Sequence, residues 1–195
     1  LAAEMHLFPR GAEAGTVLHD VLERIDLGAL DPAEVRRVAL QEVERSPLAA
    51  DVVPKIEHVV RAVARTPLRV EPRPFRLGDV PRSRFVPELE FTLAASGEDA
   101  GPGFSAEALA EVLADAPAGS PLARYADRAR SLAWPTLSGY LRGFIDAVFF
   151  DGERYALLDY KSNHLGDRRR DYLPDRLVEP MIEQPVGEKI GRAHV

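Results

Sequence analysis

Residues 143–166, GFIDAVFFDGERYALLDYKSNHLG, decide the fold, because they have the pattern of two β-strands joined by a tight turn. Asp151-Gly152 is a strong two-residue hairpin signal between the apolar runs 137–150 and 154–160, which we predict to be strands. Asp146, Asp159 and Lys161 interrupt these runs. Strand interiors usually exclude such charges, so their presence calls for a chemical explanation.

The three charged residues can converge if the hairpin forms. Side chains alternate along a strand, so Asp159 and Lys161 share one face. Asp146 lies thirteen positions before Asp159 (159 − 146) with the turn about midway, so antiparallel pairing brings the two carboxylates within reach. Converging carboxylates repel unless a cation offsets their charge, and Mg²⁺ suits them best. With Lys161 to orient water or stabilise the transition state, this set predicts phosphodiester hydrolysis.

A simpler interpretation stays open on spacing alone. Asp159 and Lys161 could form an ordinary ion pair at a strand end, and Asp146 could cap a turn. Glu88 and Glu90 fall on one face of a third predicted strand, where they are further candidate ligands or a solvated surface. His19 lies on one helical face with Glu23, where its imidazole could meet a metal or a phosphate, or be structural.

The rest of the chain predicts a helix, a helical insert and then strands. Apolar spacing predicts helices at 16–26, 32–46 and 51–65, with Asp31 as the cap of the second. Alternation predicts a strand at 85–94, followed by a surface loop at 95–103. Ser105 should cap a short helix that reaches residue 114, and we predict a loop at 116–130.

Composition indicates a folded domain. The chain has 195 residues, of which 46% are hydrophobic and 29% charged, far from the signature of disorder. Its net charge of −6 counts mildly against nucleic acid as a partner, but a basic surface can be local. It has no cysteine, which excludes disulfides and thiolate chemistry and fits a cytoplasmic location. No apolar run reaches about 18 residues, so no membrane contact is expected.

Four segments together carry a resemblance to a known family. They are FPRGAEAGTVLHDVLERIDL at 8–27, PELEF at 87–91, LRGFIDAVF at 141–149 and RYALLDYKSNHLG at 154–166. Their order and spacing resemble the C-terminal nuclease domain of RecB, the helicase-nuclease subunit of RecBCD, which is also called exodeoxyribonuclease V. The match runs from residue 8 to about 183.

The resemblance implies a restriction-endonuclease-like PD-(D/E)xK fold, an α/β fold with a mixed central sheet flanked by helices. It implies a Mg²⁺-dependent deoxyribonuclease, with Mn²⁺ able to substitute, that acts mainly on single strands of unwound DNA in repair and recombination beside RecC-like and RecD-like subunits. The implied metal-site residues are His19, Asp146 and Asp159, and the implied catalytic residues are Glu88, Asp146, Asp159 and Lys161. Glu90 ranks below Glu88. Arg168, Arg169 and Arg170 are candidates for binding DNA phosphates, or an ordinary solvated loop.

Two departures from the family pattern set the expected boundaries. The family continues with a helix that bears a Gln-x-x-x-Tyr motif, which has no counterpart here, and the helicase motor that precedes the nuclease has none either. We therefore expect residues 1–14 to end a linker, 15–184 to be a nuclease domain without its last part, and 185–195 to be a non-native tail. The isolated polypeptide could be inactive. A non-catalytic nuclease-like docking or DNA-guiding module is the alternative function.

Overall fold

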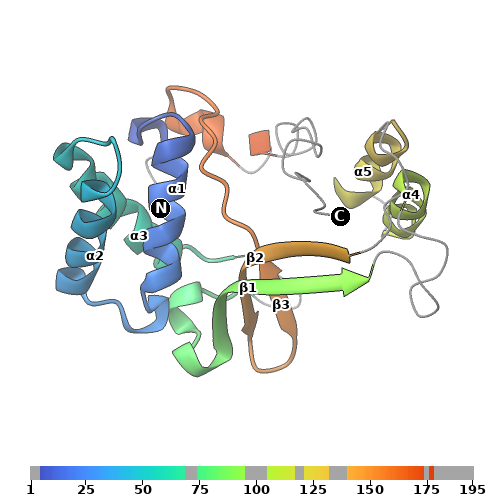
Figure 1. Ribbon diagram of the computed structural model, residues 1–195, viewed down its shortest axis with the longest axis horizontal. Coiled ribbons are helices and arrows are strands. Elements are labelled where there is room, and N and C mark those ends of the chain that lie inside the picture. Colours follow the sequence, from blue (N-terminus) through green and yellow to red (C-terminus); the bar gives the residue numbers. More distant parts are fainter. Residues whose placement is uncertain are drawn as a thin grey trace. The chain divides into compact units, whose positions relative to one another are not determined.

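The structure is a computed structural model that describes residues 5–68, 74–94, 105–116, 121–131, 140–173 and 176–177 (Figure 1). The chain divides into two compact units. The first unit comprises Leu1–Leu89 and Phe144–Leu173, and the second comprises Glu90–Gly143 and Pro174–Val195. The predicted tail at 185–195 lies outside the described residues. None of the described helices is long and apolar enough to cross a membrane.

Three helices form the helical part of the first unit. They are α1 (Ala12–Arg24), α2 (Pro32–Glu44) and α3 (Val53–Arg65). The predicted helices are confirmed with small shifts at their ends. Asp31 caps α2 as predicted, because its side chain accepts a hydrogen bond from the N–H of Ala33 before Pro32 opens the helix. Apolar stripes of all three helices enter one core, with Val21, Val60 and Ile56 fully buried.

A charged contact also joins α1 to α2. Arg24, in the last turn of α1, pairs with Glu42 of α2, which is only 7% exposed. Arg45 approaches the same carboxylate at 3.2 Å, so Glu42 has two cationic partners. A buried carboxylate requires such partners, and removal of one side of a buried pair is costly. The pair therefore fixes the position of α1, which carries His19, against α2.

Three strands form an antiparallel sheet in the order β1-β2-β3. They are β1 (Phe85–Ala94), β2 (Tyr140–Phe150) and β3 (Tyr155–Leu158). The hairpin is confirmed, with pairs from Ala147↔Leu158 to Phe150↔Tyr155. Its turn is centred one residue later than predicted, because the N–H of Asp151 donates to the carbonyl of Arg154 and Gly152 takes a φ of 112°. The predicted strand start at 137–139 lies outside the described residues.

The buried face of the hairpin packs against the helices. Ala147 and Phe149 are buried and join the cluster formed by α1, α2 and α3. The Phe149 ring lies against the rings of Phe75 and Phe85, with centroids 5.2 Å and 6.2 Å away. Burial of these side chains stabilises the fold and fixes which face of β2 and β3 turns outward. The outward face carries the charged residues of the candidate site.

Short 3-10 turns connect the longer elements of the first unit. They are η1 (Met5–Leu7), η2 (Leu27–Ala29), η3 (Ala50–Val52), η4 (Leu77–Asp79), η5 (Arg82–Arg84) and η6 (Arg169–Tyr172).

The second unit contains a helix that we did not predict. The helix capped by Ser105 is confirmed as α4 (Ala106–Ala114), but residues 121–130 are helical and form α5 (Pro121–Arg130) rather than part of a loop. Pro121 is well suited to open a helix, and the Ala and Arg residues after it are good helix formers. Ala126 and Ala129, one turn apart, are buried, as is Ala110 of α4. Packing of these small side chains explains a helix that hydrophobicity does not reveal.

The fold class is confirmed only at the level of mixed α and β structure. The described sheet has three antiparallel strands, whereas the predicted restriction-endonuclease-like core has a mixed sheet flanked by helices. That wider core stays a prediction.

Candidate functional site

His19 lies at the border between the buried and exposed faces of α1. Its neighbours Val17, Leu18, Val21 and Leu22 are buried, whereas 28% of the His19 side chain is exposed. Its Nδ1 lies 3.5 Å from Oδ2 of Asp146, which belongs to β2. The imidazole is thus held between the helix and the sheet, with access to solvent.

Asp146 is the residue that joins the parts of the site. It lies within β2 beside buried Ala147, and only 16% of its side chain is exposed. Its Oδ2 accepts a hydrogen bond of 2.6 Å from the N–H of Tyr160, just after β3. Asp146 therefore contacts α1 on one side and the chain that follows the hairpin on the other. The alternative that Asp146 caps a turn is wrong, because the hairpin turn lies beyond Phe150.

Tyr160 packs beneath the candidate site. Its ring meets the edge of the His19 ring at 5.9 Å between centroids and an angle of 89°. Its buried hydroxyl has no hydrogen-bond partner among the described residues. Burial, followed by the neighbouring Asp146 carboxylate, raises the pKa of Tyr160 well above its ordinary value. Tyr160 is therefore a neutral side chain that supports the His19 ring.

Glu88 lies in β1 with an unusual backbone conformation. Its φ of 45° is the only positive value among the described residues other than glycine. Such a conformation is costly for a side chain with a Cβ, and it interrupts the alternation of the strand. Partial desolvation, then the carboxylates of Glu23 and Asp146, raise the pKa of Glu88, while His19 opposes the shift. The charge of Glu88 therefore interacts with the charges of His19 and Asp146.

Glu90 does not share this environment. It forms an ion pair with Arg142 of β2, and both residues belong to the second unit. The sequence placed Glu88 and Glu90 on one face because strict alternation cannot separate them. The left-handed residue at Glu88 explains why two acids so close in sequence have different neighbours.

Asp159 and Lys161 follow β3 instead of lying inside it. We predicted a strand to residue 160, but β3 ends at Leu158. The Asp159 carboxylate pairs directly with the Lys161 ammonium, and the two side chains are 58% and 36% exposed. Because Ala147 pairs with Leu158, the next register position sets Asp159 opposite Asp146. The predicted approach of the two acids is therefore consistent with the register.

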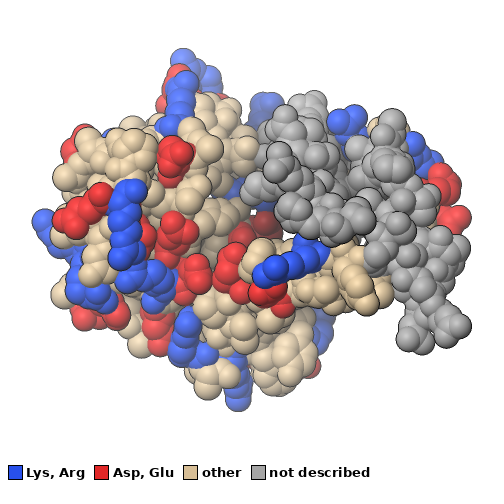
Figure 2. All heavy atoms as spheres, in the orientation of Figure 1, with Lys and Arg blue, Asp and Glu red and all other residues tan. Residues whose placement is uncertain are grey.

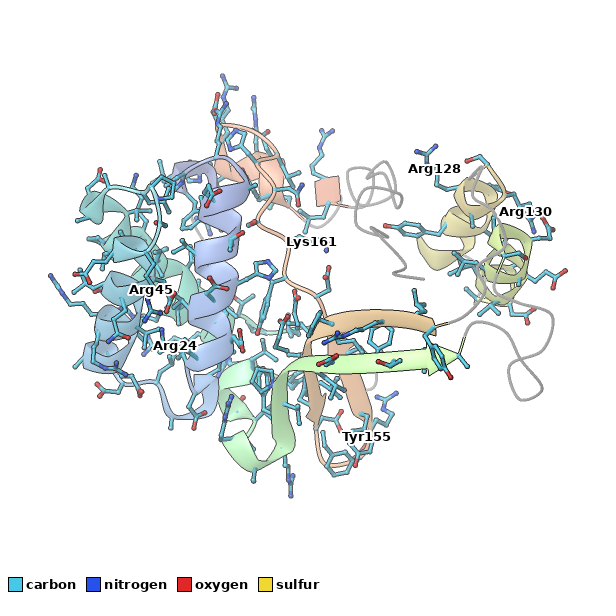
Figure 3. The ribbon with its side chains drawn as sticks, viewed as in Figure 1. Arg24, Arg45, Arg128, Arg130, Tyr155 and Lys161 are labelled. Carbon is cyan, nitrogen blue, oxygen red and sulfur yellow. The ribbon has the colours of Figure 1, made fainter. Side chains whose placement is uncertain are left out.

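The chain that carries Lys161 then runs beside α1. Figure 3 shows Lys161 on this segment, at the opposite end of the hairpin from Tyr155. The close approach depends on Gly15 of α1, because a Cβ there would lie 2.6 Å from the hydroxyl of Ser162. Gly15 thus brings the residues after Lys161 against the helix that carries His19.

The three arginines proposed for DNA binding lie at the far end of this segment. Arg168 is the cap residue of η6, and its backbone N–H donates a hydrogen bond of 3.0 Å to Oδ2 of Asp171. Arg168, Arg169 and Arg170 are all exposed. Both readings of this run, a phosphate contact and a solvated loop, stay open.

Two further acids belong to the electrostatic neighbourhood. The carboxylates of Asp20 and Glu23, both on α1, contribute to raising the pKa of Glu88. The pKa of Asp20 is itself raised, first by desolvation and then by the Glu42 carboxylate. Figure 2 shows acidic side chains gathered beside α1 and over the part of the sheet that adjoins it. Glu23 could be found from its helical spacing to His19, whereas Asp20 has no comparable sequence signal.

The donor types fit a divalent cation, although the ligand geometry is incomplete. The Asp146 carboxylate and the His19 imidazole lie 3.5 Å apart, and both influence the pKa of Glu88, whose carboxylate is a third candidate donor. Within the described ranges, however, no three His, Asp or Glu side chains are arranged closely enough to hold a metal ion. The site is therefore chemically suited to a cation without a complete ligand set in place.

Replacement of Glu88 by Gln is expected to stabilise the metal-free chain at neutral pH. The pKa of Glu88 is raised in the fold, so the unfolded chain releases its proton first. Stability is therefore lost as the pH rises from the ordinary value of 4.5 through the folded pKa, and Glu88→Gln should remove that loss. Denaturant unfolding in EDTA, from about pH 4 to about pH 8, measures the difference.

Glu90→Gln is the matched control for this experiment. Its carboxylate has a cationic partner in Arg142, so its removal should bring no gain in stability. Equal stability of Glu88→Gln and the parent across the whole pH range would show that Glu88 does not experience the neighbouring acids.

The comparisons with known proteins agree on one family. No protein-family model matches the chain. The chain is 35% identical to "RecBCD enzyme subunit RecB" of Mycobacterium tuberculosis over 93% of its length, which is 18% of that protein. It is 33% identical to the Mycolicibacterium smegmatis protein of the same name over 89% of its length, which is 17% of that protein. It is 30% identical to the Escherichia coli protein of that name over 90% of its length, which is 14% of that protein. The chain thus spans less than a fifth of the curated relatives it matches, and the resemblance to RecB is confirmed.

Proposed function

We propose that this chain, which belongs to the RecB family and matches a segment of that subunit, is a metal-dependent deoxyribonuclease domain of a RecBCD-like helicase-nuclease. One observation carries this proposal. His19 and Asp146 lie 3.5 Å apart. Asp159, which is ion-paired with Lys161, lies one register position beyond the pair Ala147↔Leu158 and therefore opposite Asp146. These are residues that the family resemblance assigns to the nuclease site.

The chain's own groups suggest distinct roles. His19, Asp146 and Asp159 would hold Mg²⁺, or Mn²⁺ in its place, and Glu88 would add a carboxylate beside them. The cation, when bound, supplies positive charge at the phosphoryl group that is attacked. Asp159 orients the Lys161 ammonium by direct contact, and Lys161 would stabilise negative charge on the phosphoryl oxygens or orient the attacking water. The N–H of Tyr160 fixes the Asp146 carboxylate in place.

The proposed setting of this domain follows from the family. We place it within a restriction-endonuclease-like PD-(D/E)xK core at the C-terminal end of a RecB-like subunit. Its substrate would be unwound DNA, mainly single strands, and its partners would be RecC-like and RecD-like subunits during double-strand break repair and recombination. Such a substrate implies a cytoplasmic protein. Arg168, Arg169 and Arg170 would contact DNA phosphates from the exposed η6 segment.

A second candidate function is a non-catalytic docking or DNA-guiding module. It is favoured by the incomplete ligand set, since among the described residues no three donors are arranged to hold a cation. It is disfavoured by the charged residues themselves, because His19 and Asp146 are in contact and Asp159 is paired with Lys161 one register position beyond the Ala147–Leu158 pair. Cation binding separates the two candidates.

The nuclease domain is expected to gain thermal stability from Mg²⁺ or Mn²⁺. A ligand that binds only the folded state stabilises it by about 2.7 kcal/mol when its concentration is about 100 times its Kd. The midpoint of thermal unfolding should rise with either ion and return with EDTA, and Asp146→Asn should suppress the rise. Glu90→Gln, which changes a carboxylate paired with Arg142, should respond like the parent.

Cleavage of end-labelled single-stranded DNA in the same ions completes the test. The nuclease proposal expects products with Mg²⁺ or Mn²⁺ and none with EDTA. A chain that shows neither products nor a rise in its unfolding midpoint would be assigned to the docking module.

A further inference from the structure

The outward face of the hairpin carries two aromatic side chains at its tip. Phe150 and Tyr155 are the last pair before the turn, so their side chains lie on the same face. Their ring centroids are 5.1 Å apart, and Tyr155 is 79% exposed. Leu157, two residues along the same strand, is 70% exposed. What distinguishes these side chains is that they adjoin one another on one face, because contiguous apolar patches, unlike single exposed residues, mark binding surfaces.

An arginine lies over one ring of this aromatic pair. The guanidinium carbon of Arg84 lies 5.7 Å from the centroid of the Phe150 ring. The same side chain passes over the turn, because a Cβ on Gly152 would lie 3.6 Å from its Nη1. The Asp151 carboxylate at this turn already accepts the N–H groups of Glu153 and Arg154. The tip therefore combines aromatic faces with a guanidinium, which suits a ligand that has both flat rings and negative charge.

The same face leads from the tip to the candidate active site. Because Phe150 pairs with Tyr155 and Val148 with Leu157, alternation continues this face to Asp146 and Asp159. Asp146 lies four positions before Phe150 (150 − 146), or about 14 Å along the strand. A single strand of a few nucleotides spans that distance. Figure 3 shows the corresponding labelled residues, Tyr155 at one end of the hairpin and Lys161 beyond the other.

We propose that Tyr155, Phe150 and Arg84 form a stacking platform for the bases of single-stranded DNA on its way to the candidate active site. Tyr155 presents its ring for stacking, Phe150 supports it from the side, and Arg84 provides positive charge next to Phe150. Stacking on a ring is tolerant of sequence because every base has a flat face. The platform rests on the proposed nuclease function, since it identifies where the substrate of that site is held.

The test measures binding in EDTA, where cleavage cannot interfere. Fluorescence anisotropy of the full chain is recorded with an oligothymidylate of about 12 nucleotides, within the usual range of single-strand sites, and with an abasic strand of equal length. The parent should prefer the strand with bases. Tyr155→Ala should weaken binding of that strand about tenfold and leave the abasic strand unchanged, whereas Tyr155→Phe should bind like the parent.

Charge is tested with a second pair of variants. Arg84→Ala should weaken binding of both strands and reduce the salt dependence by about one ion. Arg128 is an exposed arginine on α5 in the second unit, so Arg128→Ala is the matched control and should leave both affinities unchanged. Val112→Ala removes a side chain that is 71% exposed elsewhere and controls for the loss of apolar surface.

Two results would overturn the platform. One is a parent without preference for bases, and the other is a Tyr155→Ala variant that keeps the preference. A variant with unchanged DNA binding but weaker association with a partner subunit would assign the face to a protein interface instead. The nuclease function is judged separately, by cleavage in Mg²⁺ or Mn²⁺, so either proposal can fail while the other stands.

Discussion

Asp159→Ala is expected to abolish cleavage of single-stranded DNA while the chain stays folded. The substitution removes a carboxylate proposed to hold the cation and also releases Lys161 from its ion pair. Both side chains are substantially exposed, and pairs of this kind contribute about 0–1 kcal/mol to stability. Loss of activity should therefore come without loss of fold. Cleavage of labelled DNA and denaturant unfolding, measured on the same preparation, check the two parts.

The matched control for this variant is Asp127→Ala. Asp127 is also an exposed acid in an ion pair, with Arg130 at 3.0 Å, but it lies in the second unit. The control should change neither cleavage nor stability. Equal cleavage by Asp159→Ala and the parent would reduce Asp159 and Lys161 to an ordinary surface ion pair, the simpler interpretation that spacing left open.

Local signals explain which parts of the fold could be predicted. Asp31 and Ser105 cap helices where the sequence indicated, because a cap depends only on its own side chain and the next few N–H groups. Strand β1 has the predicted bounds, and the two hairpin strands pair antiparallel as predicted, with the turn one residue later. In each case the information lies within a few residues.

Features that depend on distant contacts could not be predicted in this way. Helix α5 follows a run of Gly, Ser and Pro, and its buried Ala126 and Ala129 are too small to give a hydrophobic pattern. The difference between Glu88 and Glu90 depends on one left-handed backbone conformation at a residue that does not favour it. Neither feature has a signal in the neighbouring sequence.

The candidate site was predictable in its members but not in how they are held. The family motifs named His19 and Asp146, whereas the structure shows that Asp146 also accepts the N–H of Tyr160. This bond connects β2 to the chain that carries Lys161. Asp146 thus has a structural role that Asp159, exposed and beyond the strand, does not have. The two aspartates should therefore respond differently to the same substitution.

Asp146→Ala is expected to abolish cleavage and also to destabilise the fold. Its side chain is only 16% exposed, and its removal leaves the N–H of Tyr160 without this acceptor. An unpaired group of this kind costs about 1–3 kcal/mol. Relief of repulsion toward Glu88 offsets part of that cost. Denaturant unfolding in EDTA should place Asp146→Ala below both the parent and Asp159→Ala.

Asp146→Asn separates the two roles of this residue. The amide oxygen can still accept the Tyr160 N–H, while the negative charge beside Glu88 and His19 is lost. We therefore expect a variant as stable as the parent that no longer cleaves DNA and no longer responds to Mg²⁺ or Mn²⁺. If Asp146→Asn cleaved like the parent, the charge of Asp146 would have no part in catalysis, and its role would be confined to the hydrogen bond that joins β2 to Tyr160.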